Sequence, residues 1–274
     1  MKKLNLKRMT ILVGSLVISS SSFAHFQMMY TPNSNVTEQK EVPFKVMFTH
    51  PADGMEAHDM SIGKDIDGKI KGMKEFLVVH KGKSKNYASF LKEVKFGPHQ
   101  VTAYDFILDK TTSFRGGGDW GIVAVPYPYY EGSEDIYIQQ ITKVFVNKAE
   151  IITDWSNRIA EGYPEIIPTV NPTNTWVGGL FNGKVVDCEG KAVENAEIEV
   201  EYLNAEVDME DSKFVGLPKT EKAASLIYAD DNGYFSFVPT SKGYWGFAAL
   251  GAGGEKGYRG KELSQDAVLW IEAK

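Results

Sequence analysis

The sequence predicts an all-β protein made of two β-sandwich-like domains that follow a signal peptide. Short apolar segments that alternate with polar residues recur along the chain, for example at residues 42–48 and 197–202. Gly, Pro and Asn separate these segments, as is typical of turns between strands. A two-proline segment at 165–174 resembles an interdomain linker. We therefore predict one domain over residues 25–174 and a second over residues 175–274.

Residues 1–24 have the pattern of a secretory signal peptide. A basic start (Lys2, Lys3, Lys7 and Arg8) precedes an apolar core at 9–18, which is too short to cross a bilayer. The small-x-small site that ends at Ala24 predicts cleavage before His25. No Cys lies directly after this apolar core, and no other long apolar run exists. We therefore expect a periplasmic protein with no direct membrane insertion.

Charge and cysteine content exclude some classes of protein. Removal of residues 1–24 lowers the formal net charge from −6 to −10. Such an acidic chain is a poor partner for nucleic acid. Cys188 is the single cysteine, so no intrachain disulfide can form. Stability must therefore come from a packed core.

The first predicted domain begins with a half-buried strand at 42–48, and His50 lies just past its end. A long loop is expected at 51–69. Further strands are predicted at 75–80, 101–108, 121–125 and 136–146. Residues 115–119 predict a glycine turn, and 151–160 a short helix.

One segment of this domain has two interpretations. Residues 126–135 combine Pro and Tyr with Glu131, Glu134 and Asp135. Prolines and tyrosines make rigid loop corners, whereas the carboxylates could face a ligand. The sequence favours the corner but leaves both interpretations open.

The second predicted domain starts near Trp176. Strands are predicted around 181–186, 197–202, 234–238, 244–250 and 267–271. The acidic turn at 230–233 is only weak evidence for calcium, because further oxygen ligands are missing nearby in sequence. A glycine-rich mobile loop is expected at 251–260.

The histidines indicate a metal site. If cleavage exposes His25, its amino group and imidazole can chelate one metal ion, because both groups lose their protons near neutral pH. His50, His58 and Met60 are the candidates to complete the site. Nitrogen donors suit Ni, Co, Cu and Zn, whereas a sulfur-rich shell would favour Cu(I). His80 and His99 are interpreted as polar surface residues.

Enzymatic functions find little support. The sequence has no Gly-x-Ser-x-Gly or HExxH motif, and acidic neighbours make Cys188 a poor nucleophile. We therefore predict a protein that is not an enzyme. The alternatives are a copper-binding protein, a copper oxidase, and a structural or adhesive β-sandwich protein whose histidines are incidental.

Several motifs together resemble a periplasmic nickel/cobalt-uptake family, a domain family of formally unknown function often called NikK-like, found beside energy-coupling-factor nickel transporters. The matching segments are His25-Phe26-Gln27, Phe48-Thr49-His50-Pro51 with Met60, Pro128-Tyr129-Tyr130-Glu131 with Glu134-Asp135, Ile141-Thr142-Lys143-Val144, Glu165-Ile166-Ile167-Pro168, Glu199-Val200-Glu201-Tyr202, Asp231-Asn232-Gly233 and residues 245–250.

The resemblance implies a periplasmic accessory protein that captures Ni(II) or Co(II) as cargo and passes it to a membrane metal transporter of the energy-coupling-factor type. By motif position it points to His25 and His50 as ligands, with His58 less secure. Residues 183–186 and 190–196 also look like a carboxypeptidase-regulatory, transthyretin-like sandwich.

Overall fold

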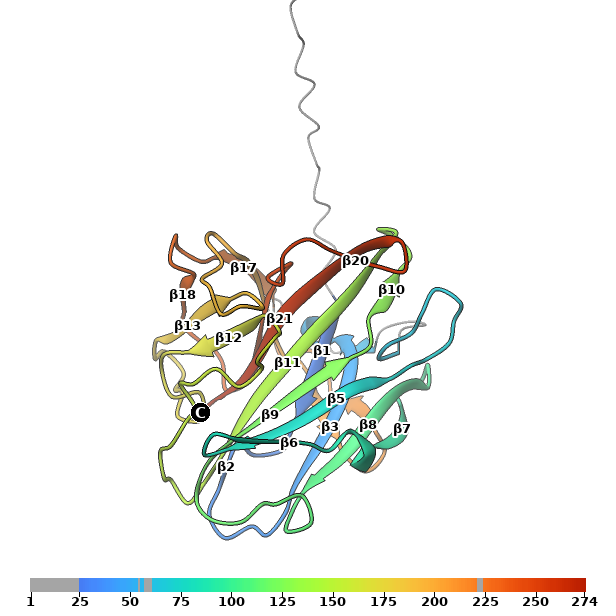
Figure 1. The fold of residues 1–274 in the computed structure, drawn as a ribbon. Helices are drawn as coiled ribbons and strands as arrows, with labels where there is room; N and C mark the ends of the chain where they lie inside the picture. The colour runs from blue at the N-terminus through green and yellow to red at the C-terminus, as the bar shows by residue number, and fades with distance from the viewer. Residues whose placement is uncertain (1–24, 54, 57–60, 221–223) are drawn as a thin grey trace, which may run out of the picture.

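The computed structural model describes residues 25–53, 55–56, 61–220 and 224–274 (Figure 1). Strands make up its regular structure, and the helices in these ranges are two short 3-10 turns, η1 (Pro51–Asp53) and η2 (Ala88–Phe90). The all-β, sandwich-like prediction is therefore confirmed. The helix predicted at 151–160 is wrong, because that segment forms turns and bends. No helix in the described ranges is long and apolar enough to cross a membrane.

A large sheet forms the centre of the molecule (Figure 1). Its strand order is β17 (Ala224–Tyr228), β14 (Glu197–Tyr202), β19 (Gly243–Ala249), β21 (Lys261–Ala273), β11 (Ile136–Lys148), β9 (Gly118–Pro126), β5 (Met73–His80) and β6 (Lys83–Asn86). Three short strands extend it: β2 (Asn35–Val36) and β10 (Tyr129–Glu131) pair with β11, and β20 (Lys256–Tyr258) pairs with β21.

Smaller sheets complete the fold. One has the order β1 (Phe26–Tyr30), β3 (Val42–His50), β8 (Val101–Leu108) and β7 (Lys92–Phe96), with β4 (Met55–Glu56) paired to β3. Another has the order β12 (Glu165–Pro168), β13 (Phe181–Val186) and β18 (Tyr234–Phe237). A two-stranded ribbon joins β15 (Glu206–Asp208) to β16 (Lys213–Val215).

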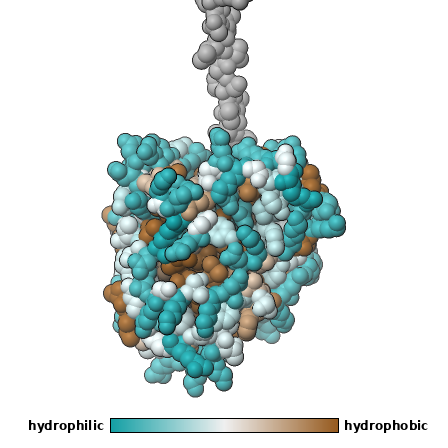
Figure 2. All heavy atoms as spheres, viewed as in Figure 1, coloured by the Kyte–Doolittle hydropathy of each residue, from teal (hydrophilic) through white to brown (hydrophobic). Residues whose placement is uncertain are grey.

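Each face of the central sheet packs against one smaller sheet, because successive side chains of a strand point to opposite faces. Val144 of β11 belongs to the apolar cluster that also contains Phe26 and Phe44 of the β1 sheet. Its neighbour Phe145 belongs to the cluster that contains Phe181 and Phe235 of the β12 sheet. The molecule therefore has two cores, one on each side of β11. Polar side chains cover most of the face in Figure 2, with apolar ones gathered near its middle.

The central sheet continues across residue 174. Strand β11 comes before that residue and β21 after it, yet the two pair in parallel, with Ile141 opposite Ala267. The two predicted domains therefore share one sheet.

Two other predictions need correction. The strand at 42–48 is not half-buried, because Lys45 and Met47 on its second face are also fully buried. Lys45 Nζ lies 2.6 Å from both Asp105 Oδ1 and Ser212 Oγ, and Ser212 belongs to the connection between β15 and β16. The segment at 251–260 is not only loop, since it contains β20, which pairs with β21.

Candidate metal site

Strand register brings His25 and His50 together. Strands β1 and β3 are antiparallel, with Phe26 opposite Thr49. One step further along the same register places His25 opposite His50, the last residue of β3. The ring centroids of the two histidines are 4.3 Å apart with a 48° tilt. The His25 ring also stacks on Phe48, at 5.6 Å.

A carboxylate from the central sheet faces this pair. Glu131 ends β10, and its Oε2 lies 3.7 Å from His25 Nδ1. The other oxygen, Oε1, accepts hydrogen bonds from the main-chain N and the Oγ of Ser133, at 3.1 and 2.6 Å. These bonds leave Oε2 directed at the histidine. Tyr129 of the same short strand packs against Phe48 at 4.6 Å, so β10 is held against β3.

Burial controls the charge of His25. Desolvation is the largest cause that lowers the pKa of His25, to about 4, and the nearby His50 lowers it further, while Glu131 opposes both effects. The ring is therefore neutral at pH 7. A neutral imidazole offers a nitrogen lone pair without first losing a proton. Its side chain keeps 23% of its surface exposed, so the ring can be reached from solvent.

A buried carboxyl holds the segment that follows His50. Glu201 of β14 accepts a hydrogen bond from the main-chain N of Ala52, two residues after His50, at 3.0 Å. Burial raises the pKa of Glu201 to about 8, helped by Glu199 and Asp53. Its carboxyl is therefore mostly protonated at pH 7.

The structure describes two of the four predicted ligands. His25 and His50 are brought together, whereas His58 and Met60 lie outside the described residues. Within the described ranges, no three His, Cys, Asp or Glu side chains are already arranged to hold a metal. A complete site therefore needs a further donor, such as the amino group that cleavage before His25 would expose.

Three methionines and one further histidine of the first predicted domain are held by packing contacts. Met28, Met29 and Met47 are fully buried in the core, so they bring no sulfur to the rim. His80 stacks on Trp120 with ring centroids 3.8 Å apart, and its Nδ1 lies 2.8 Å from the carbonyl oxygen of Asp119.

Sequence reasoning missed part of the site. Glu131 is one of three carboxylates in a segment that the sequence favours as a loop corner, and only the pairing of β10 with β11 selects it. Glu201 carries no local signal of its burial, because it sits in the middle of an ordinary strand pattern. Sequence analysis placed His25 and His50 in one candidate site, but it predicted no strand at 26–30, so the register that brings them together follows only from the structure.

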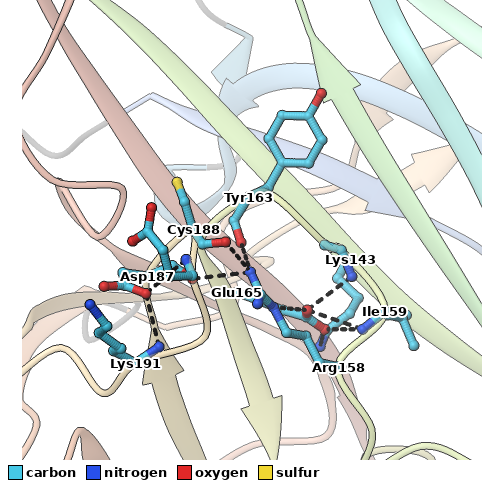
Figure 3. A network of polar contacts seen from close by, with 10 residues as sticks. Lys143, Arg158, Ile159, Tyr163, Glu165, Asp187, Cys188 and Lys191 are labelled. Atoms are coloured by element: carbon cyan, nitrogen blue, oxygen red, sulfur yellow. Dashed lines mark hydrogen bonds and ion pairs between the residues drawn. The ribbon is translucent and has the colours of Figure 1, made fainter.

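A second polar cluster lies on the opposite face of β11 (Figure 3). Lys143 Nζ and Glu165 Oε1 are 2.5 Å apart, and both side chains are 2% exposed. Glu165 also accepts hydrogen bonds from the main-chain N of Ile159 and Ala160, at 2.9 to 3.1 Å. Arg158 Nη2 donates to the carbonyl oxygen of Cys188 at 2.6 Å. This cluster ties the 158–165 segment to the central sheet.

Comparison with known proteins identifies a domain family. A family model described as a domain of unknown function (DUF4198) matches residues 22–253. No curated protein matches the sequence. The family match agrees with the part of the resemblance that named a domain family of unknown function.

The solved structures that the chain matches have low identity to it. The native conformation of Escherichia coli alpha-2-macroglobulin is 11% identical over 93% of this chain and 14% of that protein, with a TM-score of 0.20. A putative membrane anchored protein from Corynebacterium diphtheriae is 12% identical over 90% of this chain and 58% of that protein, with a TM-score of 0.24. The Yersinia pseudotuberculosis adhesin InvE is 11% identical over 89% and 58%, with a TM-score of 0.22. The chain thus spans less than two thirds of each.

Proposed function

We propose that this chain, which belongs to the DUF4198 family of domains of unknown function, binds one late first-row transition-metal ion, Ni(II) or Co(II), as transported cargo. One observation carries the proposal. His25 and His50 form a cross-strand pair with ring centroids 4.3 Å apart, and the Glu131 carboxylate lies 3.7 Å from His25 Nδ1. Two imidazoles, from the residue before β1 and from the end of β3, therefore lie side by side, with the Glu131 carboxylate of β10 near the first of them.

The donor chemistry supports a nitrogen-rich site. Imidazole nitrogens suit Ni, Co, Cu and Zn, and the low pKa of His25 keeps its ring neutral. Cleavage before His25 adds an amino nitrogen on the same residue, which forms a chelate with the imidazole. His58 and Met60 are proposed as adaptable further ligands.

The position of the site supports a cargo role. The His25 and Glu131 side chains keep 23% and 14% of their surface exposed, so incoming ligands can reach the metal. A transported ion must leave as well as bind, and ligand exchange at a partly open site allows this. We propose that the protein works in the periplasm and passes the metal to a membrane metal transporter of the energy-coupling-factor type, as the family resemblance implies.

Copper is the second candidate cargo. Raw affinity of nitrogen sites rises to Cu(II), so a Ni(II) site of this kind also binds copper when copper is available. A sulfur-rich Cu(I) site finds less support, because Met28, Met29 and Met47 are buried in the core. Metal supply and transfer to a partner, rather than affinity alone, then select nickel or cobalt.

Calorimetric titration tests the proposal directly. The processed protein that begins at His25 is titrated with Ni(II), Co(II), Cu(II) and Zn(II), beside a version with one extra N-terminal Gly. We expect one Ni(II) or Co(II) per chain and a large loss of affinity in the extended version, because the extra residue converts the amino group to an amide.

Three results would contradict the proposal. Binding of Cu(II) alone would indicate copper handling. Oxidase activity with copper and a reductant would indicate an enzyme. No binding of any of the four metals would favour a structural or adhesive protein.

A further inference from the structure

We infer that Gln140 is a positioning residue of this metal site, whose side-chain amide fixes the main chain of His25 so that the nitrogens of that residue are held toward His50. The inference rests on the proposed function and adds to it a residue that does not touch the metal.

The Gln140 side chain bonds to the main chain at the start of β1 in the way that the main chain of a neighbouring strand would. Its Nε2 donates to the carbonyl oxygen of His25 at 2.9 Å, and its Oε1 accepts from the main-chain N of Gln27 at 2.6 Å. One side chain thus pairs with both main-chain groups that the start of β1 turns toward β11. Gln140 itself is 2% exposed, so solvent does not compete for these bonds.

The side chain of Gln27 strengthens the same contact from the opposite direction. Its Nε2 donates to the carbonyl oxygen of Gln140 at 3.1 Å and to Thr142 Oγ1 at 2.9 Å. The carbonyl oxygen of Gln27 accepts from Trp270 Nε1 at 3.1 Å. Gln27, the third residue after the predicted cleavage point, is therefore held through its main-chain N and O and its side-chain Nε2.

The orientation of the Gln140 amide is determined by its partners. The main-chain N of Gln27 can only donate, so the atom that faces it is the oxygen. The nitrogen then faces the His25 carbonyl and also lies 3.4 Å from Asp266 Oδ2. Asp266 is held in turn by Gly251 N and Ser264 Oγ, which donate to its Oδ1 at 2.9 and 2.8 Å.

Packing alone does not explain why these positions are polar. Further along the same two strands, Met29, Val144 and Val146 hold β1 against β11 with apolar side chains. Apolar contacts are non-directional, and buried amides stabilise a fold only when their hydrogen bonds are satisfied. Directional bonds at the end next to His25 fix the main chain in place, as the outer-shell partners of metal ligands do in known sites.

The neighbouring glutamine provides a matched control. Gln139 is 4% exposed and lies on the opposite face of β11. It also makes two side-chain hydrogen bonds, donating to the carbonyl oxygen of Pro126 and accepting from Gln265 Nε2, both at 2.6 Å. The variants Gln140→Met and Gln139→Met therefore remove the same group and a similar number of buried hydrogen bonds, but only the first releases His25.

The experiment compares both variants with the wild type in the processed protein. Ni(II) affinity is measured by calorimetry, and the geometry of bound Co(II) by its visible absorption spectrum. We expect Gln140→Met to lower Ni(II) affinity about 10- to 100-fold, the range typical of outer-shell partners, and to change the Co(II) spectrum. We expect Gln139→Met to keep the wild-type affinity and spectrum. Both variants should lower the melting temperature.

Equal affinities and spectra in both variants would overturn this inference while leaving the proposed function intact. Absence of metal binding by the wild type would overturn the proposed function and the inference with it. If Gln140→Met does not fold, Gln140→Asn replaces it, since the shorter side chain keeps the amide but does not reach both His25 and Gln27. The same loss is expected, with faster hydrogen exchange in metal-free protein at the start of β1.

Discussion

The two faces of β11 carry two buried polar clusters of different kinds. On one face, Lys143 and Glu165 form an ion pair that is almost fully buried and surrounded by further hydrogen bonds. On the other, Gln140 and Thr142 hold the start of β1, whose His25 reaches the surface beside His50. In the first cluster, the charges of Lys143 and Glu165 neutralise each other within the core. The second fixes the start of β1, next to His25, whose side chain keeps 23% of its surface exposed.

Breaking the ion pair should have the largest effect on stability and none on metal binding. Lys143→Met leaves the Glu165 carboxylate buried without its cation, which typically costs about 3–5 kcal/mol. Urea unfolding measures this loss, and calorimetry with Ni(II) should show wild-type affinity. The double variant Lys143→Met, Glu165→Met should recover only part of the stability, because the main-chain N of Ile159 and Ala160 lose their acceptor. A loss of Ni(II) affinity in Lys143→Met as large as that in Gln140→Met would remove the distinction between the two faces.

Acid should lower the free energy of unfolding through protonation of His25. The pKa of His25 falls from 6.5 to about 4 on folding, so the unfolded chain takes up a proton before the folded one does. This contribution is fully present above pH 6.5 and is lost as the pH falls toward 4, by about 3 kcal/mol in total. Unfolding of the version with one Gly before His25, measured from pH 7 to 4, tests the expectation.

A matched variant isolates this effect from that of Glu201. The raised pKa of Glu201, about 8 against 4.5, has the opposite sign, because its contribution is lost as the pH rises between those values. His25→Asn in the same extended protein keeps Glu201 and lacks the imidazole. The stability difference between the two proteins should shrink toward acid, and parallel curves would contradict the low pKa of His25.

Replacement of His50, the partner of His25, should change Ni(II) affinity. His50→Asn removes one proposed ligand, and we expect Ni(II) affinity to fall by at least about 100-fold, or roughly 2.7 kcal/mol. His80→Asn is the control, because His80 packs on Trp120 away from the proposed ligands. Calorimetry on both variants measures the difference. Equal affinities would show that His50 is not a ligand.

The smallest expected effect belongs to Glu131. Glu131→Gln keeps the size of the side chain and an acceptor for Ser133, but removes the charge beside His25. We expect a loss of about tenfold in Ni(II) affinity, or roughly 1.4 kcal/mol. In the metal-free protein, the pKa of His25 should fall further, since the Glu131 charge raises it. An NMR titration that showed a higher pKa would contradict the proposed geometry.

Local patterns were enough to predict the longer strands, whereas short strands such as β1 and β10 were not predicted. The strand predicted at 136–146 is β11 (Ile136–Lys148), and the strand predicted at 101–108 is β8 with the same bounds. These predictions succeed because the period of apolar residues along one segment reports directly on its burial. The choice of His25 was likewise local, since it follows from the predicted cleavage site.

The sequence by itself thus determined the all-β class, the positions of the longer strands, and the choice of His25 and His50 as candidate ligands. Only the tertiary structure decided that Lys45 is buried, that β11 and β21 share a sheet, and that Gln140 contacts His25 across 115 positions of sequence. The physical reason is that strand pairing and sheet packing join residues that are distant along the chain. No single segment contains the information about which partner another segment will bring to its side chains.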